Sequence, residues 1–435
     1  MMKYILIFLF LIGAAMAEVK SALPKHYQTQ LKNGLEVVII PLKNGSNVIS
    51  TDIFYKVGSR NEIMGKSGIA HMLEHLNFKS TKNLKAGEFD RIVKGFGGST
   101  NASTGFDYTH YFVKSSTQNL GKSLELFAEL MQNLNLKDEE FQPERNVVAE
   151  ERLWRTDNDP IGYMYFRLFN TAFVYHPYHW TPIGFMDDIR NWNIEDIKEF
   201  HKTYYQPQNA IVVVAGDVDE KEALKEVKKH FEKIKNTAKE LPKVYMQEPK
   251  QDGMRRANIH KQTEVEVLSL SYRIPSFTHK DQVALSALSE ILSGGKSSRL
   301  VSQMVDKKRI AIEVEAYNMD LVDEGLFIFF ALANQGVSLE RIEKELLAQI
   351  EQIKAGKITQ AELDKVKTNM RINFLYGLES SSSVASLFGS YLARGSLQTL
   401  LDFEENFEKL ELKDVIEVAN RIFVSKNSTL VTLQK

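Results

Sequence analysis

The stretch GIAHMLEHLNF, residues 68–78, carries the strongest chemical signal in the chain. It places His71 and His75 four positions apart, with Glu74 directly before the second histidine. Residues four apart lie on one face of a helix, so both imidazoles would project together. This spacing suits a metal site, but it also suits two structural histidines on an ordinary helix. The choice between the two depends on the rest of the sequence.

A catalytic zinc site needs a third protein ligand, usually a carboxylate, and keeps a fourth position for water. The segment PERNVVAEERLWR, residues 143–155, can supply that ligand from a second helix. On a helix, Glu144, Val147, Val148 and Glu151 share one face. An acid at either end of an apolar stripe is costly to bury unless it is paired or bound to a metal. The pattern predicts Glu151 as the third ligand and Glu144 as an auxiliary acid, whereas a solvated acidic face fits the other glutamates of this region better.

Composition indicates a globular chain of more than one domain. The 435 residues suit two domains of about 200 residues each. Hydrophobic residues make up 43% and charged residues 26%, which is typical of folded proteins. The net charge of -1 gives no indication of nucleic acid or an anionic membrane as a partner.

The N-terminus reads as a secretory signal peptide. Lys3 precedes an apolar run, and Ala15-Met16-Ala17 forms an A-x-A cleavage site, so residues 1–17 are expected to be removed. The alternative is an uncleaved membrane anchor, but the run is shorter than the ~20 residues that a spanning helix needs. We therefore expect a periplasmic or secreted protein with no stable membrane anchor.

The chain contains no cysteine, although export usually permits disulfides. Its stability is therefore expected to come from packing alone. Lipid attachment through a cysteine is excluded.

The order of elements repeats along the chain. Strand and helix patterns fill residues 18–235, a polar segment with two prolines follows at 236–253, and a similar order returns at 254–435. We predict an α+β fold of two homologous α/β half-domains, each an antiparallel sheet with helices packed on one face, joined by that segment as a linker. The second half has no histidine pair, so the chemistry is expected in the first.

These motifs together resemble the pitrilysin/insulinase family of zinc peptidases. His71-x-x-Glu74-His75 is the inverted zinc motif of inverzincins, and Glu151 follows His75 by 76 positions (151 − 75 = 76). Other segments similar to that family are LKNGLEVVIIP, GSRNE, GGSTNASTGFDYTHY, HPYHWTPIG and GGKSSRL. The family includes the mitochondrial processing peptidases and bacterial enzymes built from two chains.

The resemblance implies that His71, His75 and Glu151 hold one zinc ion per chain. Glu74 would act as general base and take a proton from the water that the metal activates. The resemblance also implies that Asn101 and Ala102 contact the backbone of a peptide substrate. The alternation in STNASTGFDYTHYF, from Ser99, suits an edge strand to which an extended peptide could add, although Asn101 could also be a turn residue.

Two further patterns are interpreted as structural features and not as functional sites. SGGKSS ends like a phosphate-binding loop, but Glu290 stands where that loop needs glycine, so a helix-ending turn is expected. His179 has no ligand spacing to the zinc motif and is interpreted as structural.

One departure from the family pattern concerns the second half. Related enzymes carry an arginine and a tyrosine after the segment SSRL, where they hold substrate and the developing oxyanion. In this chain, Met304 and Ile312 stand at the corresponding positions. Some bacterial relatives solve this by pairing two chains, one with the zinc motif and one with the arginine and tyrosine.

The sequence therefore predicts a secreted zinc metalloendopeptidase for short or unfolded peptides, as the catalytic chain of a two-chain enzyme. Its partner would be a homologous chain without HxxEH, or a second copy in a homodimer. The alternative is a peptide-binding or assembly subunit without turnover. The complete set of His71, Glu74, His75 and Glu151 argues against it, because such a subunit has no chemical need for all four.

Overall fold

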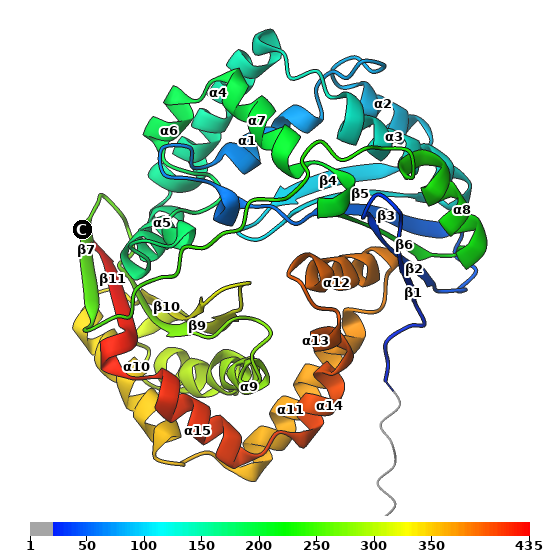
Figure 1. The fold of residues 1–435 in the computed structure, drawn as a ribbon. Coiled ribbons are helices and arrows are strands. Elements are labelled where there is room, and N and C mark those ends of the chain that lie inside the picture. Colours follow the sequence, from blue (N-terminus) through cyan, green and yellow to red (C-terminus); the bar gives the residue numbers. More distant parts are fainter. Residues whose placement is uncertain (1–20) are drawn as a thin grey trace, which may run out of the picture.

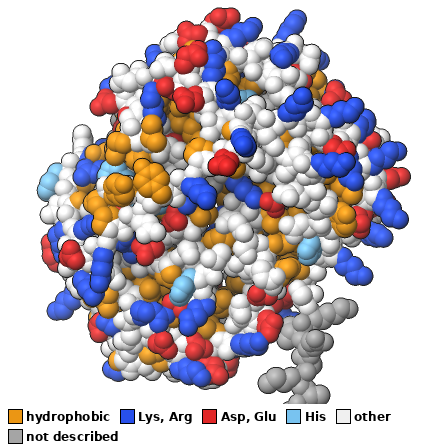
Figure 2. Space-filling view, in the orientation of Figure 1, with side chains coloured by type: hydrophobic (Ala, Val, Ile, Leu, Met, Phe, Trp, Pro, Cys, Tyr) orange, Lys and Arg blue, Asp and Glu red, His pale blue; other side chains and the backbone are white. Residues whose placement is uncertain are grey.

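A computed structural model describes residues 21–435, which form two halves, each built on one sheet (Figure 1). The predicted signal peptide, residues 1–17, lies outside the described residues. Within residues 21–435, no helix combines the length and the apolar character needed to cross a bilayer. Basic and acidic side chains are interspersed over the face seen in Figure 2.

The first sheet has six strands in the order β1-β2-β6-β3-β5-β4. They are β1 (Tyr27–Gln30), β2 (Glu36–Pro41), β3 (Val48–Tyr55), β4 (Ser99–Thr104), β5 (Thr109–Ser116) and β6 (Ala210–Gly216). The β2–β6 pair is parallel, and the other neighbours are antiparallel. Strand β4 forms one edge of this sheet.

The second sheet has five strands in the order β7-β11-β8-β10-β9. They are β7 (Arg255–His260), β8 (Val267–Ile274), β9 (Ala311–Met319), β10 (Gly325–Ala333) and β11 (Ser428–Gln434). Its one parallel pair is β7–β11. Apart from β1, the strands follow the same order as in the first sheet, so β9 corresponds to β4. The predicted α+β architecture of two similar halves is confirmed; each sheet is mixed because its last strand inserts beside an early strand that runs the same way.

Helices surround both sheets. The first half contains α1 (Ile69–Asn77), α2 (Glu88–Gly95), α3 (Leu120–Asn133), α4 (Asp138–Arg152), α5 (Pro160–Ala172), α6 (Met186–Asn191), α7 (Ile194–Tyr204) and α8 (Glu220–Phe231). The second contains α9 (Gln282–Ser293), α10 (Leu339–Lys354), α11 (Gln360–Tyr376), α12 (Ser381–Ala393), α13 (Gln398–Leu401), α14 (Phe403–Lys409) and α15 (Leu412–Ile422). Helices α1, α3 and α8 bury their apolar faces in one core on the first sheet.

Each half also lends one helix to the other half. Phe169 of α5 packs in a core with Val431 of β11, so a helix of the first half covers the second sheet (Figure 1). Phe388 of α12 packs with Val213 of β6 on the face of the first sheet that points away from α1. Both faces of each sheet are therefore covered, and the second cover comes from the other half.

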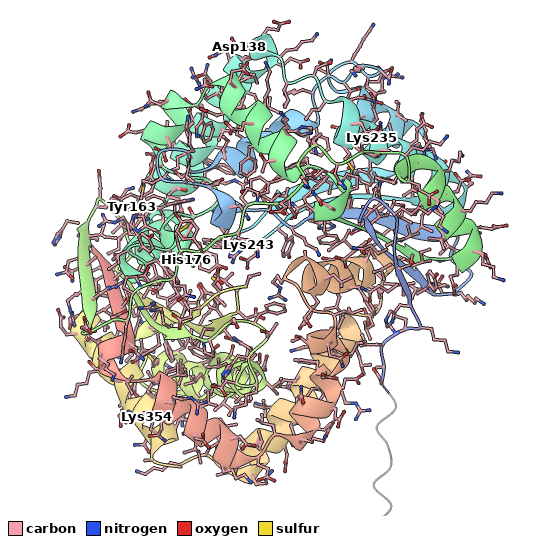
Figure 3. All side chains as sticks on the ribbon, in the orientation of Figure 1. Asp138, Tyr163, His176, Lys235, Lys243 and Lys354 are labelled. Carbon is pink, nitrogen blue, oxygen red and sulfur yellow. The ribbon has the colours of Figure 1, made fainter. Side chains whose placement is uncertain are left out.

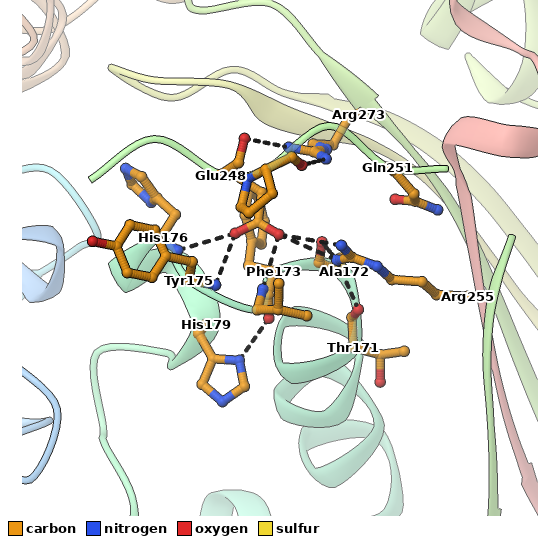
Figure 4. Close-up of polar contacts among 12 residues, drawn as sticks. Thr171, Ala172, Phe173, Tyr175, His176, His179, Glu248, Gln251, Arg255 and Arg273 are labelled. Carbon is orange, nitrogen blue, oxygen red and sulfur yellow. Dashed lines mark hydrogen bonds and ion pairs between the residues drawn. The ribbon is translucent and has the colours of Figure 1, made fainter. Parts of the chain in front are cut away.

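The segment 236–253 contains no helix or strand, as expected for a linker, but it is tied down. The Glu248 carboxylate accepts the backbone N–H groups of Val174, Tyr175 and His176 and pairs with Arg255 (Figure 4). His176 in turn lies where the two halves meet (Figure 3) and contacts Asp323 of the second half at 2.9 Å. These contacts hold the segment against both halves rather than leaving it as a free tether.

Candidate metal centre

Helix α1 presents the two histidines on the face opposite its core face. Its buried side chains include Met72 and Leu73, both 0% exposed. His71 and His75 lie on the other side of the helix, partly exposed, with their ring centroids 4.7 Å apart. The helical period of the motif therefore turns its polar groups toward a shared space.

Helix α4 lies against α1 and carries the predicted third ligand. Phe141 and Val148 bury it in the core, both at 0% exposure. The prediction that Val147 shares an apolar stripe with Val148 is wrong, because Val147 is 50% exposed and lies round the helix toward solvent. The buried face of α4 is therefore narrower than the pattern suggested. Glu151 lies beside this face.

The structure brings His71, His75 and Glu151 together. Nε2 of His71 and Nε2 of His75 lie 3.7 Å and 3.4 Å from Oε2 of Glu151. One ligand atom from each residue falls within 4.8 Å of the others. A tetrahedral zinc ion with bonds of about 2.0–2.1 Å separates its ligand atoms by about 3.3–3.4 Å. The three donors fit a zinc ion, and a tetrahedral ion there would keep one position without a protein ligand.

The protonation of the metal-free site follows from its burial and pairing. Burial, followed by the neighbouring His75, lowers the pKa of His71 to about 4, so this imidazole is in the neutral form that binds metals. Burial alone would lower the pKa of His75 as well. Hydrogen bonds to Glu144 and Glu151 outweigh it and raise that pKa to about 9. A metal ion would therefore displace a proton from His75.

Glu144 lies on the other side of His75, outside the group of three. Nδ1 of His75 donates a hydrogen bond to Oε1 of Glu144 at 2.8 Å, and Lys79 pairs with the second oxygen at 2.6 Å. This contact leaves Nε2 of His75 free for a metal. The geometry thus gives the predicted auxiliary acid a positioning contact with His75.

Glu74 lies beside the histidines and next to the end of the edge strand. Thr104, the last residue of β4, donates its hydroxyl to Oε2 of Glu74 at 2.5 Å. Burial raises the pKa of Glu74, against this hydrogen bond, which lowers it. A carboxyl group with a raised pKa is suited to accept and return a proton.

Asn101 and Ala102 lie in the middle of β4, opposite Phe112 and Tyr111 of β5. The alternative interpretation of Asn101 as a turn residue is therefore wrong. Because β4 has β5 as its one neighbour in the sheet, its other edge presents unpaired backbone groups beside the histidines. A peptide strand could add there.

Sequence reasoning missed Glu62, which supports the start of α1. Gly68 at the N-cap has no side chain to cap the helix. Instead, the buried Glu62 carboxylate accepts the N–H groups of Gly68 and Ala70 and the indole N–H of Trp180, each at 2.8 Å. Burial raises the pKa of Glu62 to about 8, against these three hydrogen bonds. Its position in GSRNE gave no signal, because the contact depends on how the loop folds back.

The second half offers no donor at the two positions singled out by sequence. Met304 is 0% exposed in the core of the second half, so its side chain packs there. Ile312 lies on the edge strand β9 and is 54% exposed.

The SGGKSS segment and His179 both have local structural roles. The SGGKSS segment follows α9, which ends at Ser293 with Gly294 as its C-cap, so the predicted helix-ending turn is confirmed. Nδ1 of His179 contacts the Phe173 carbonyl at 2.6 Å, in keeping with a structural histidine.

Comparisons with known families and proteins agree with this geometry. Residues 37–162 match the model of "Insulinase (Peptidase family M16)", and residues 191–370 match "Peptidase M16 inactive domain". The chain is 59% identical to the zinc protease PqqE of Helicobacter pylori, over 98% of this chain and 97% of that protein. It is 24% identical to a probable mitochondrial-processing peptidase subunit beta of Arabidopsis thaliana, over 93% of this chain and 77% of that protein.

A solved structure shares the whole fold. The crystal structure of a protease from Helicobacter pylori superposes with a TM-score of 0.93 at 60% identity, covering 95% of this chain and 100% of that chain. The family match extends over both halves, and the donor set fits zinc. The chain therefore belongs to the insulinase family, peptidase family M16, and is a zinc metallopeptidase.

Proposed function

We propose that the chain is the catalytic subunit of an exported, periplasmic or secreted, two-chain endopeptidase that cleaves short or unfolded peptides. The observation that carries this proposal is the convergence of His71, His75 and Glu151, with Glu74 beside them at the end of an exposed edge strand. A zinc ion held by the three ligands would act as a Lewis acid and would lower the pKa of a bound water to about 7.

The side chains of the chain itself account for the proton transfers. Glu74 accepts a proton as the oxygen of water attacks the carbonyl carbon of the peptide. It then returns that proton to the leaving nitrogen as the C–N bond breaks. Glu144 keeps His75 oriented through Nδ1 during both steps.

Strand β4 would hold the substrate. An extended peptide pairing with its free edge gains backbone hydrogen bonds that do not depend on sequence, which suits unfolded chains. Asn101 and Ala102 lie in the middle of that strand, and Thr104 links its end to Glu74. The carbonyl to be attacked would lie near this end.

The two-chain part of the proposal rests on the second half. Met304 is buried and Ile312 is aliphatic, so neither can donate a hydrogen bond to an oxyanion. Loss of one such donor typically costs about a hundred- to a thousand-fold in rate. A homologous chain without HxxEH would supply these donors by closing its own second half over this zinc site, whereas a second copy carries the same Met304 and Ile312 and would not.

The test is peptide hydrolysis by the purified mature chain, alone and with the candidate partner at equal concentration. We expect little activity alone and a large increase with the partner. Strong activity from the isolated chain, unchanged by any partner, would refute the two-chain proposal. No activity under either condition would favour a binding or assembly subunit.

A further inference from the structure

A cavity of about 540 Å³, lined mostly by polar residues, lies between α12 and the first sheet, on the face away from α1. From the sheet it is lined by Asp52, His110, Phe112 and Lys114. From α12 it is lined largely by serines, which include Ser382 and Ser386. None of these residues takes part in the chemistry proposed above.

The cavity faces the same side of the sheet as alternate residues of the edge strand. In the β4–β5 pair, Ser99 lies opposite Lys114, Asn101 opposite Phe112, and Ser103 opposite His110. Directly opposed residues of antiparallel strands project on the same face. Ser99, Asn101 and Ser103 are all exposed. The intervening residues of β4, such as Ala102 and Thr104, project toward α1, the helix that carries His71 and His75.

The acid of the cavity is already satisfied. Oδ1 of Asp52 accepts the hydroxyl of Ser50 at 2.5 Å, and Oδ2 lies 2.7 Å from Nε2 of His110. The Asp52 side chain is 1% exposed, and the His110 ring stacks on Phe54 with centroids 4.0 Å apart. Asp52 is therefore fully engaged with its neighbours and presents no free carboxylate oxygen to a ligand.

The positive charge of the cavity comes from Lys114. The Lys114 ammonium lies 5.2 Å from the centre of the Phe112 ring, and Lys114 forms no ion pair with any acid among residues 21–435. Ser382 and Ser386 of α12 line the same cavity. An ammonium with hydroxyl donors nearby, and no available acid, favours an anionic ligand.

We propose that this cavity accepts an acidic side chain of the peptide substrate, an Asp or Glu whose side chain points to the α12 face of β4. The inference rests on the proposed function, because it requires a peptide paired with the edge of β4. A peptide strand there would lie about 4.8 Å from β4 and about 9.6 Å from β5. A glutamate side chain and the Lys114 side chain together span that gap, and the small side chains of Ser99 and Ser103 leave it open.

The test uses matched fluorescent peptides that carry Glu, Ala or Lys at successive positions, one position at a time. Binding is measured on the zinc-loaded Glu74→Gln chain, with the partner present if activity needs it, and kcat/KM is measured on the active enzyme. We expect Glu to be favoured over Lys by about fivefold at positions of one parity, as a partly exposed ion pair allows. Lys114→Glu should reverse this preference.

Lys122→Glu on α3 is the matched control, since Lys122 is a partly exposed lysine that pairs with Glu125 instead. It should leave the preference unchanged. Hydrolysis without any charge preference, or a preference that Lys114→Glu does not alter, would overturn the cavity assignment. Charge-dependent binding without hydrolysis by any form would instead overturn the proposed function and keep the cavity.

Discussion

Nδ1 of His75 lies 2.8 Å from Oε1 of Glu144, while Nε2 of the same ring lies 3.4 Å from Oε2 of Glu151. Glu144 and Glu151, both on α4, therefore contact the two different nitrogens of the His75 ring. The first fixes the ring and its tautomer, and the second belongs to the group of three residues that can hold a metal ion. Lys79 holds the other oxygen of Glu144, so this orientation is braced from outside the site.

The contact between Glu144 and His75 predicts a change in metal affinity. Glu144→Ala should weaken zinc binding by about 10- to 100-fold, because the ring loses the acceptor that orients it. Competition with a chelator of known affinity measures the change. Glu139→Ala, an exposed acid in the first turn of α4, is the control and should bind zinc like the unaltered chain. Equal affinity in both variants would mean that Glu144 does not support His75.

Glu74 is predicted to act in the reaction and not in metal binding. Glu74→Gln should keep the fold and the zinc, because the change leaves His71, His75 and Glu151 intact. It should lower kcat by about a hundred- to ten-thousand-fold, since the amide cannot accept a proton. Hydrolysis of a quenched fluorescent peptide by the zinc-loaded protein measures the effect. Undiminished hydrolysis would show that another group is the base.

Glu62 is predicted to stabilise the N-terminal end of α1. Glu62→Ala would leave the N–H groups of Gly68, Ala70 and Trp180 without their acceptor in a buried place. Each buried unpaired group costs about 1–3 kcal/mol, so the free energy of unfolding should fall by at least about 2 kcal/mol. Urea denaturation of the metal-free chain measures this. Trp180→Phe, which removes one donor together with its need for an acceptor, should cost less; the reverse order would contradict the assignment.

The lowered pKa of Asp323, which lies where the two halves meet, predicts that the free energy of unfolding depends on pH. Burial raises its pKa, but hydrogen bonds from His176 and Arg60 outweigh this and lower it to about 2. A carboxyl group with a lowered pKa contributes stability above its unfolded pKa of about 3.9, and that contribution is lost as the pH falls toward 2. Asp323→Asn should therefore be less stable near pH 6, with a difference that shrinks between about pH 4 and 2. The effect should be modest, since the side chain is 38% exposed.

Urea denaturation of the two metal-free proteins from pH 2 to 6 measures this difference. A stability gap that stays constant down to pH 2 would mean that the charge of Asp323 does not contribute. The metal-free form is used because zinc release in acid would otherwise dominate the transition.

The sequence could indicate which three residues come together at the candidate metal centre because most of their signals are local. His71 and His75 share a helical face by spacing alone, and Met72 and Leu73 fall on the opposite, buried face. Glu151 required two steps, the helical pattern of its own segment and the demand of zinc for a third ligand. The error at Val147 shows the limit of such patterns, since a helical period gives a face but not the width of the part that packs.

Other features depend on contacts between distant segments and left no periodic trace. Glu62 and Thr104 act through loops and strand ends that meet α1 only in the folded chain. The packing of α5 on the second sheet and of α12 on the first sheet could not be predicted either. Each helix has an apolar face, but that pattern does not say which of two similar sheets the face will cover.

The most direct test of the central claim is the zinc content of the purified chain and of three variants, measured by elemental analysis after dialysis. The account predicts about one zinc per chain in the unaltered protein and in Glu74→Gln, and nearly none in His75→Ala and Glu151→Ala. Full zinc in Glu151→Ala, or loss of zinc in Glu74→Gln, would contradict the assignment of His71, His75 and Glu151 as the ligands with Glu74 as the base beside them.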